Sequence, residues 1–208
     1  MKIALLIYPE FSLYEMTPLT AKLTLQYQQK VDIIASKKIL YQSEDGFQVM
    51  PHYALEEIDL ARYELILLTG TLDPFVAVND LNLIKALSKV SLENTLVASI
   101  SSSPILLAKA GLLNNHLYTG GIYRNYFNSF SWLKASNYVP RLCMIDRNLI
   151  TAIGSSKAVP LFTDSVLAKC HFISDFPELS NEEVLFTLDQ KDYESMIEEV
   201  LNLYPNIR

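Results

Sequence analysis

The sequence contains few of the residues from which metal and redox sites are built. Its 208 residues include only two cysteines and three histidines. Cys143 and Cys170 have neither the spacing of metal ligands nor that of a disulfide framework, and we expect both to be reduced and buried. The sequence also lacks a phosphate-binding loop, a dinucleotide fingerprint and a cluster of metal ligands. We therefore expect no cofactor and no bound metal.

Basic residues are also scarce: 17 Lys and Arg stand against 23 Asp and Glu, which gives a net charge of −6. They are scattered, whereas surfaces that bind nucleic acids need them clustered, and no lipid-binding patch is visible either. No apolar run approaches the roughly 18 residues that span a bilayer. The N-terminal run MKIALLIYPEF is too short for a signal peptide. These absences predict a cytoplasmic protein with no nucleic-acid or membrane partner.

What the sequence does contain is a globular composition. Half of its residues are apolar and 19% are charged, and a chain of this length usually forms one domain, which we expect to span residues 1–208. Short apolar runs alternate with segments of helical periodicity. The runs that predict strands are 2–8, 31–36, 63–70 and 94–100, and the segments that predict helices are 18–30, 80–90 and 104–113. This alternation predicts a parallel sheet covered by helices on both faces.

The remaining segments are less regular. Residues 39–51 predict a hairpin with an Asp-Gly turn, and residues 141–153 predict two strand pieces around a second turn. Residues 156–170 and the acidic segment 191–204 both predict helices. Because ligands of parallel α/β sheets bind at the carboxyl ends of the strands, we expect any site to lie at that edge.

Residues 96–107, with the sequence LVASISSSPILL, have the form of a nucleophile elbow. An apolar strand run ends there and a helix follows almost at once. Ser101 lies at this junction, where the unsatisfied amides of the first helical turn can stabilise an oxyanion. The simpler alternative is that Ser102 or Ser103 caps the helix, Pro104 fills its first turn and nothing reacts. The residues alone leave both interpretations open, and a serine nucleophile would also need a base.

The order of these segments resembles that of the ThiJ/PfpI family, within the class I glutamine amidotransferase-like superfamily. Four segments carry the resemblance: KIALLIYPEFSLYEMTPL, SEDGFQVMPHYALEEIDLARYELILLTG, LVASISSSPILLAKAGLLNNHLYTG and DRNLITAIGSSKAVPLFTDSVL. Together they cover roughly residues 1–170, and the elbow followed by LAKAGLL is fairly specific. The resemblance implies a flavodoxin-like three-layer α/β/α sandwich with a mainly parallel sheet. It also implies a homodimer.

The resemblance further implies where a site would lie. The nucleophilic cysteine of the family falls on Ser101, and the glutamate that hydrogen-bonds it falls on Glu15. The histidine that follows the cysteine in many members falls on Gly120 or Gly121. Both side chains of the usual Cys-His pair are therefore missing, and we expect Gly120 to border a ligand instead.

The oxyanion-hole amides of the family fall on Gly70 or Thr71 and on Ser102, with threonine in place of the second family glycine. A hydroxyl at the elbow does not ionise as a cysteine thiol does, so Ser101 needs a proton acceptor within about 3 Å. Three histidines are available, and we expect them to be peripheral or in a solvated loop: His52, His116 and His171. The familiar cysteine chemistry of the family is therefore not expected here.

These observations lead to hypotheses of different classes. In the first, the chain is a non-catalytic homodimer, small-ligand-binding or stress-related, with a degenerate elbow. In the second, it is a divergent amidase or hydrolase in which Ser101 attacks a carbonyl carbon while backbone amides hold the oxyanion. In a third, the acidic C-terminal helix contacts a partner. Whether the chain is an enzyme, and which small molecule it binds, stays open on the sequence alone.

Overall fold

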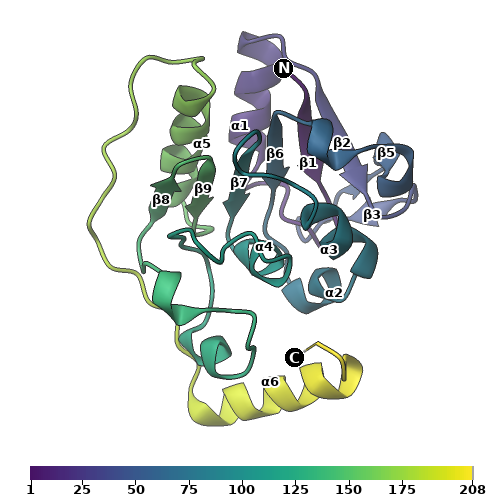
Figure 1. Cartoon of the computed structure of the whole chain (residues 1–208), viewed down its shortest axis with the longest axis vertical. Helices are drawn as coiled ribbons and strands as arrows, with labels where there is room; N and C mark the ends of the chain where they lie inside the picture. The colour runs from purple at the N-terminus through teal and green to yellow at the C-terminus, as the bar shows by residue number, and fades with distance from the viewer. Residues whose placement is uncertain (208) are drawn as a thin grey trace.

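The computed structural model describes residues 1–207 and contains a central sheet of seven strands (Figure 1). The strands lie in the order β5-β2-β1-β6-β7-β9-β8. Their bounds are β1 Ile3–Leu6, β2 Val31–Ala35, β5 Tyr53–Ala54, β6 Leu65–Leu68, β7 Leu96–Ile100, β8 Cys143–Asp146 and β9 Leu149–Ala152. Every neighbouring pair is parallel except β8 and β9, which form an antiparallel hairpin at one edge. The mainly parallel sheet is thus confirmed.

Helices cover both faces of this sheet (Figure 1). On one face, α1 (Thr17–Ala21) packs against α5 (Ala158–Lys169). On the other face, α4 (Pro104–Lys109) packs against α2 (Pro74–Val78) and α3 (Leu81–Leu87). The expected flavodoxin-like three-layer α/β/α sandwich is confirmed.

The central strands follow from their sequences. All residues of β1, β6, β7 and β9 are buried, as continuous apolar runs covered on two faces must be. Their register aligns their carboxyl ends, since Leu68 pairs with Ser99 and Ile100 pairs with Ala152. Residues just after β6, β7 and β9 therefore meet at one edge of the sheet.

Short elements connect these layers. The predicted hairpin forms between β3 (Tyr41–Gln42) and β4 (Gln48–Val49), which are antiparallel. The other short elements are the π-helical turn η1 (Lys22–Gln26) and the 3₁₀ helices η2 (Leu55–Glu57), η3 (Leu60–Arg62), η4 (Arg124–Asn128) and η5 (Ala135–Asn137). The helix predicted over 104–113 ends earlier, because Gly111 adopts a φ of +82° after its last turn.

The C-terminal segment carries α6 (Gln190–Leu203), which lies along the bottom of Figure 1. Beyond α6, Ile207 is buried, and its carbonyl accepts hydrogen bonds from Lys109 Nζ and from Trp132 Nε1, both at 2.7 Å. The Lys109 ammonium also lies 4.9 Å from the centre of the Trp132 ring. Three distant parts of the chain are thus tied together. None of the helices formed by residues 1–207 is long and apolar enough to cross a membrane.

Both cysteines are free thiols. Cys143 is buried in β8, whereas Cys170 is only partly buried after α5. Burial raises the pKa of each thiol to about 11, so neither is a thiolate near neutral pH. Among the residues that the structure describes, no three His, Cys, Asp or Glu side chains are grouped so as to hold a metal ion.

Candidate functional site

Ser101 occupies the turn between β7 and α4 in a left-handed backbone conformation, with a φ of +64°. This region disfavours a residue with a side chain by roughly 1–2 kcal/mol. Two backbone hydrogen bonds hold Ser101 in this conformation. Its N–H donates to the Ala152 carbonyl at 2.8 Å, and its carbonyl accepts from the Gly121 N–H at 2.7 Å. The elbow geometry thus projects the Ser101 side chain from the edge where the strands end.

Glu15 brings a buried carboxyl group to the Ser101 hydroxyl. Its side chain is only 3% exposed, and its Oε2 accepts a hydrogen bond from the Gly70 N–H at 3.0 Å. Desolvation raises the pKa of Glu15 from 4.5 to about 7, while hydrogen bonds from Ser101 and Gly70 act in the opposite direction. Near neutral pH this group is therefore divided between its acid and its carboxylate form.

Two glycines make this close approach feasible. A Cβ on Gly154 would overlap Glu15 Oε1 and lie 2.5 Å from Ser101 Oγ. A Cβ on Gly70 would lie 2.5 Å from Glu15 Oε2 and 2.7 Å from Ser101 Oγ. Any side chain at either position would fill the space that the carboxyl and hydroxyl groups now share. Gly154 was not among the expected site residues, although a glycine directly after an apolar strand run is typical of the edge of such a site.

The amides expected to hold an oxyanion are mostly occupied. The Gly70 N–H donates to Glu15, and the Thr71 N–H donates to Ser102 Oγ at 3.1 Å. Ser102 Oγ in turn donates to the Thr71 carbonyl at 3.0 Å. The Ser102 N–H forms no hydrogen bond with any part of the chain that the structure describes. Of the three amides, that of Ser102 is the one without a partner among the described residues.

Gly120 and Gly121, on which the sequence resemblance places a histidine, pack against the elbow. A Cβ on Gly120 would lie 2.9 Å from Pro104 Cγ and 3.0 Å from the Ser101 carbonyl oxygen, which is tighter than ordinary contact. A Cβ on Gly121 would meet nothing closer than 3.4 Å. The backbone thus has room for a side chain at Gly121 but little at Gly120.

The three histidines lie away from Ser101. His52 precedes the edge strand β5, and its Nδ1 accepts from the Ile33 N–H at 3.0 Å. His116 lies beside Asp146, and Asp146 is the last residue of β8 before the β8–β9 turn. His171 follows the end of α5 that is distant from the elbow. None is in a position to accept a proton from the elbow.

Ser103, one of the two serines considered as a cap of the helix, does not cap it with its side chain. It stands at the N-cap position of α4, but its side chain bonds no amide of that helix. Its Oγ instead donates toward the carbonyls of Leu68 and Ile100, at 3.0 and 2.7 Å, and lies 2.7 Å from Ser99 Oγ. Ser103 therefore ties β6 to β7 beneath the elbow, because a buried hydroxyl needs partners.

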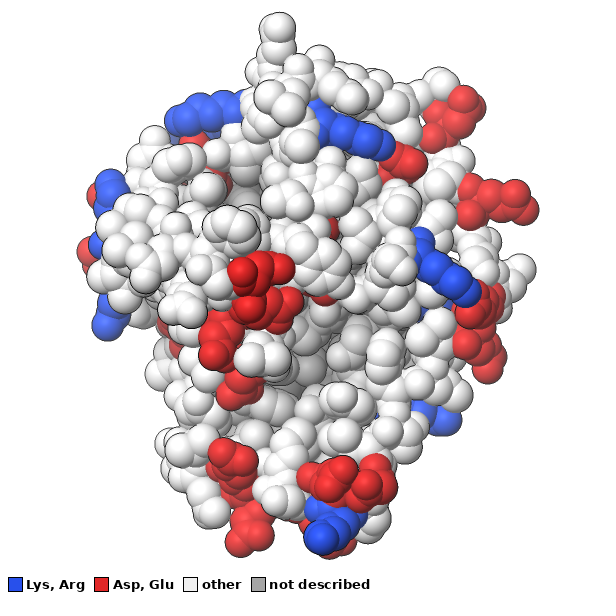
Figure 2. All heavy atoms as spheres, turned by 180° about the vertical axis from the view of Figure 1, so that it is seen from behind, with Lys and Arg blue, Asp and Glu red and all other residues white. Residues whose placement is uncertain are grey.

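Two acidic residues lie near the site. Glu44 and Asp45, in the turn of the β3–β4 hairpin, raise the pKa of both Glu15 and Tyr14 through their charge. The turn is fastened there because Asp45 Oδ2 accepts from the Leu13 N–H at 2.7 Å. Figure 2 shows acidic side chains gathered in clusters on one face of the molecule, with one cluster beside a hollow. The charges of Glu44 and Asp45 disfavour anionic ligands at the elbow.

Comparison with known proteins places this site in a family. A sequence model of the DJ-1/PfpI family matches residues 1–169. The chain is 34% identical over 86 residues to "Uncharacterized protease YdeA" of Bacillus subtilis (strain 168), a stretch that spans 41% of the chain and 42% of that relative. Its fold is similar to that of a DJ-1 superfamily protein from Agrobacterium tumefaciens, with a TM-score of 0.71, 17% identity and coverage of 96% of this chain and 99% of that one.

A ThiJ/PfpI family protein from Bacillus anthracis is similar to the same degree, with a TM-score of 0.71, 22% identity and coverage of 99% of this chain and 91% of that one. At these sequence identities, the similarity to the two solved structures establishes the fold alone. The family match covers most of the sequence and includes both Glu15 and Ser101. The chain belongs to the DJ-1/PfpI family.

Proposed function

We propose that the elbow of this chain binds a small ligand without forming a covalent bond to it. The observation that carries this proposal is the occupation of the amides around Ser101. Gly70 and Thr71 already donate to Glu15 and Ser102, so a tetrahedral oxyanion would find one free amide in place of the usual pair. The absence of a histidine beside Ser101 supports the same proposal.

The groups at the elbow favour a neutral ligand with an accepting oxygen. The free Ser102 amide donates, Ser101 both donates and accepts, and Glu15 donates when it is protonated. Because the pKa of Glu15 is about 7, the site offers one more donor in mild acid than in mild base. Small amides and ketones fit this pattern, and the acidic surroundings act against carboxylates.

A thermal-shift panel of small neutral amides and ketones tests the proposal. Ligands of the elbow raise the Tm in proportion to the logarithm of their concentration. The rise is expected to shrink in Ser101→Ala and to persist, unchanged in size, in Arg147→Met at the opposite edge of the sheet. A turnover that is measured on any panel member and lost in Ser101→Ala would overturn the non-catalytic proposal.

A second function, that of a divergent amidase or hydrolase, is favoured by the raised pKa of Glu15. A carboxylate with a pKa of about 7 is a better base than an ordinary one. Glu15 would take the proton of Ser101 as Oγ bonds to the carbonyl carbon. The leaving group would depart with that proton, and water would then hydrolyse the acyl-serine. The protease name of the Bacillus subtilis relative, matched over 42% of its length, points the same way.

Intact mass after saturation with a serine-reactive fluorophosphonate distinguishes the two functions. The non-covalent proposal expects no adduct, whereas the hydrolase expects one adduct that disappears in Ser101→Ala. Labelling by a hydrolase would also rise through about pH 7 as Glu15 ionises, and Glu15→Gln would abolish that rise.

We also propose that the chain acts inside the cell as a homodimer. Exposed apolar side chains around the β3–β4 hairpin support self-association: Ile39, Leu40, Phe47 and Met50. Light scattering on the eluting protein is expected to give twice the chain mass, and Phe47→Asp is expected to lower it. A single domain over residues 1–208 is proposed as well, since the core cluster extends from Ile3 to Ile207. A partner for the acidic helix α6 stays a prediction.

A further inference from the structure

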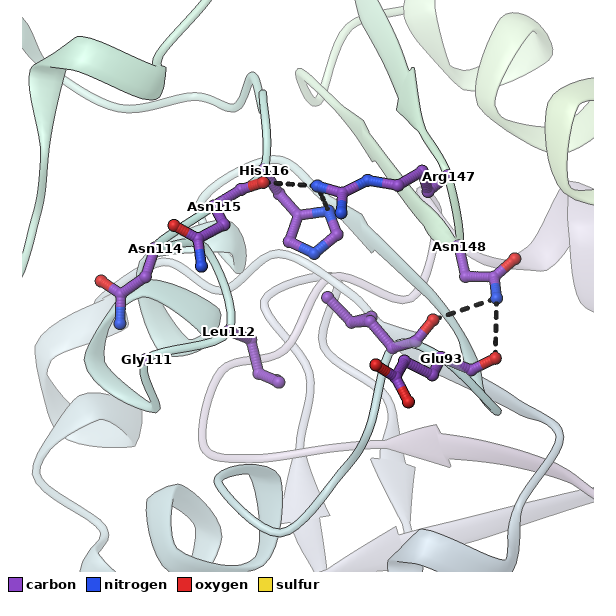
Figure 3. Close-up of a pocket in the computed structure, with 9 residues that line it drawn as sticks. Glu93, Gly111, Leu112, Asn114, Asn115, His116, Arg147 and Asn148 are labelled. Atoms are coloured by element: carbon purple, nitrogen blue, oxygen red, sulfur yellow. Dashed lines mark hydrogen bonds between the residues drawn. The ribbon is translucent and has the colours of Figure 1, made fainter.

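A second hollow lies at the edge of the sheet opposite the elbow. It has a volume of about 600 Å³ and lies between the loop before β7, the segment after α4 and the β8–β9 turn (Figure 3). Glu93 precedes the start of β7, and Ser101 follows its end, so the two sites are separated by the length of the strand. This pocket and the elbow share no residue.

Arg147 forms one wall of the pocket from the β8–β9 turn. It adopts a φ of +56°, an unusual conformation for a residue with a long side chain. Its Nε donates to Asp146 Oδ1 at 3.1 Å, and its Nη2 donates to the Asn115 carbonyl. Asp146 is itself held by the Leu117 N–H at 2.8 Å. The guanidinium is therefore fixed in direction although 62% of the side chain is exposed, and Nη1 has no partner among residues 1–207.

His116 adds a second donor to the same wall. Its Nδ1 lies 3.1 Å from Arg147 Nη2, and an arginine nitrogen is always a donor. Nδ1 also lies 3.4 Å from Asp146 Oδ2, which can only accept. In the tautomer whose Nδ1 accepts from Arg147, the ring proton is on Nε2. The side chain is only 13% exposed, and Figure 3 shows the ring directed into the space above Leu112. In this tautomer, Arg147 and His116 present donors from one side.

Glu93 presents an acceptor from the other side. Asn148 Nδ2 donates to the carbonyls of Leu92 and Glu93, at 3.0 and 3.4 Å, and so fixes the segment that carries the Glu93 side chain. Within the described part of the chain, the Glu93 carboxylate has neither a hydrogen bond nor an ion pair. Figure 3 shows Glu93 across the pocket from Arg147.

The charges of the pocket select the class of ligand. The charge of Arg147 is balanced by Asp146, whereas that of Glu93 is not balanced. An anion alone would gain from Arg147 and His116 but be repelled by Glu93, and a cation alone would leave the donors unused. We propose that this pocket binds a small zwitterion of the α-amino-acid type. Its carboxylate faces Arg147 and His116, its ammonium faces Glu93, and its side chain covers Leu112.

Ligand-observed NMR on the full chain tests this proposal with the common L-α-amino acids as probes, each beside its C-terminal amide and its N-acetyl derivative. The amide lacks the carboxylate and the acetyl derivative lacks the ammonium. Free amino acids are expected to bind, and each derivative to bind at least about tenfold more weakly, as for the loss of one charged hydrogen bond. Glu93→Gln and Arg147→Met are each expected to weaken binding of the free amino acids by a similar factor.

Ser101→Ala serves as the matched control, because it alters the elbow and leaves the pocket intact. Binding that persists in Ser101→Ala and weakens in Glu93→Gln supports the pocket. Three results overturn it: no free amino acid binds, the derivatives bind as well as the free acids, or Glu93→Gln has no effect. The Glu93 side chain forms no hydrogen bond or ion pair with residues 1–207, and its backbone bonds to Asn148 and Ser91 are kept in Glu93→Gln, so a failure of that variant cannot be attributed to unfolding. None of these results for the pocket bears on ligand binding at the elbow.

Discussion

The two edges of the sheet each carry a residue with a side chain in a left-handed backbone conformation, and the two are anchored differently. Ser101, with a φ of +64°, is held by backbone hydrogen bonds to Ala152 and Gly121 in a closely packed setting. Arg147, with a φ of +56°, is held through its own side chain at the surface. The elbow thus depends on burial and close approach, whereas the pocket depends on exposed charge.

Because of this difference, we expect substitutions at the two sites to change different properties of the protein. Desolvation at the elbow shifts the pKa of Glu15 far from its ordinary value, and a methyl group added at Gly70 or Gly154 meets the Glu15 and Ser101 side chains directly. At the pocket, water screens the charges, so substitutions are expected to change binding more than stability. Changes at the elbow should therefore be costly for the fold, and changes at the pocket should be mild.

The largest effect is expected for Gly154→Ala. The new Cβ would overlap Glu15 Oε1 and crowd Ser101 Oγ, so the free energy of unfolding should fall by about 3 kcal/mol. Urea denaturation measures it. Gly121→Ala is the matched control, because its Cβ meets only ordinary contacts at 3.4 Å and beyond, and it should stay within about 1 kcal/mol of the unchanged chain. Equal stabilities of the two variants would contradict the close packing described at the elbow.

Glu15→Gln should alter how stability depends on pH. The unfolded chain releases this proton near its ordinary pKa of 4.5, whereas the folded chain keeps it until about pH 7. Between these values the folded state binds more protons, so the Glu15 contribution falls as pH rises, by up to about 3 kcal/mol. Urea denaturation at a series of pH values should show the unchanged chain losing stability relative to Glu15→Gln across this window. A parallel pair of curves would mean that the pKa of Glu15 is not raised.

A smaller effect separates Ser101→Gly from Ser101→Ala. Both remove the hydroxyl, but only glycine adopts a φ of +64° without strain. The glycine variant should be the more stable by about 1 kcal/mol, as measured by chemical denaturation. If Ser101→Ala is as stable as Ser101→Gly, the left-handed conformation at the elbow imposes no backbone strain.

The smallest effect is expected for Arg147→Met at the opposite edge. Its ion pair with Asp146 is largely exposed on the arginine side, so the loss should stay under about 1 kcal/mol. Salt should reduce it further, because screening weakens the pair in the unchanged chain. Denaturation at low and at high salt measures both. A loss as large as that of Gly154→Ala would remove the distinction between the two edges.

Most of the fold could be predicted from the sequence, because strands buried on two faces leave a strong pattern of continuous apolar runs. The runs that became β1, β6 and β7 are almost wholly apolar, and the Asp-Gly turn of the β3–β4 hairpin is a local signal. Weaker patterns were missed. The strand β5 has only two residues, and α2 follows Asp73, an N-cap whose helix is too short to show a period.

The site was accessible only in part. The elbow at Ser101 has a local signature, and the resemblance supplied Glu15. The occupation of the Thr71 amide by Ser102 required the structure, because it joins residues 31 positions apart. The pocket at Arg147 was not foreseen for the same reason, since its donors and its acceptor come from three separate loops. Local patterns reveal elements, whereas sites assembled from distant loops emerge only on folding.

The hydrogen bond between Trp132 and Ile207 means that tryptophan fluorescence should report whether the C-terminal segment is bound to the rest of the protein. Trp132 is the single tryptophan of the chain, and its indole N–H is bonded to the Ile207 carbonyl beside the Lys109 ammonium. Release of the C-terminal segment would remove this partner and admit water to the indole. Emission at longer wavelength would therefore report undocking of that segment, separately from unfolding of the sheet and without any added label.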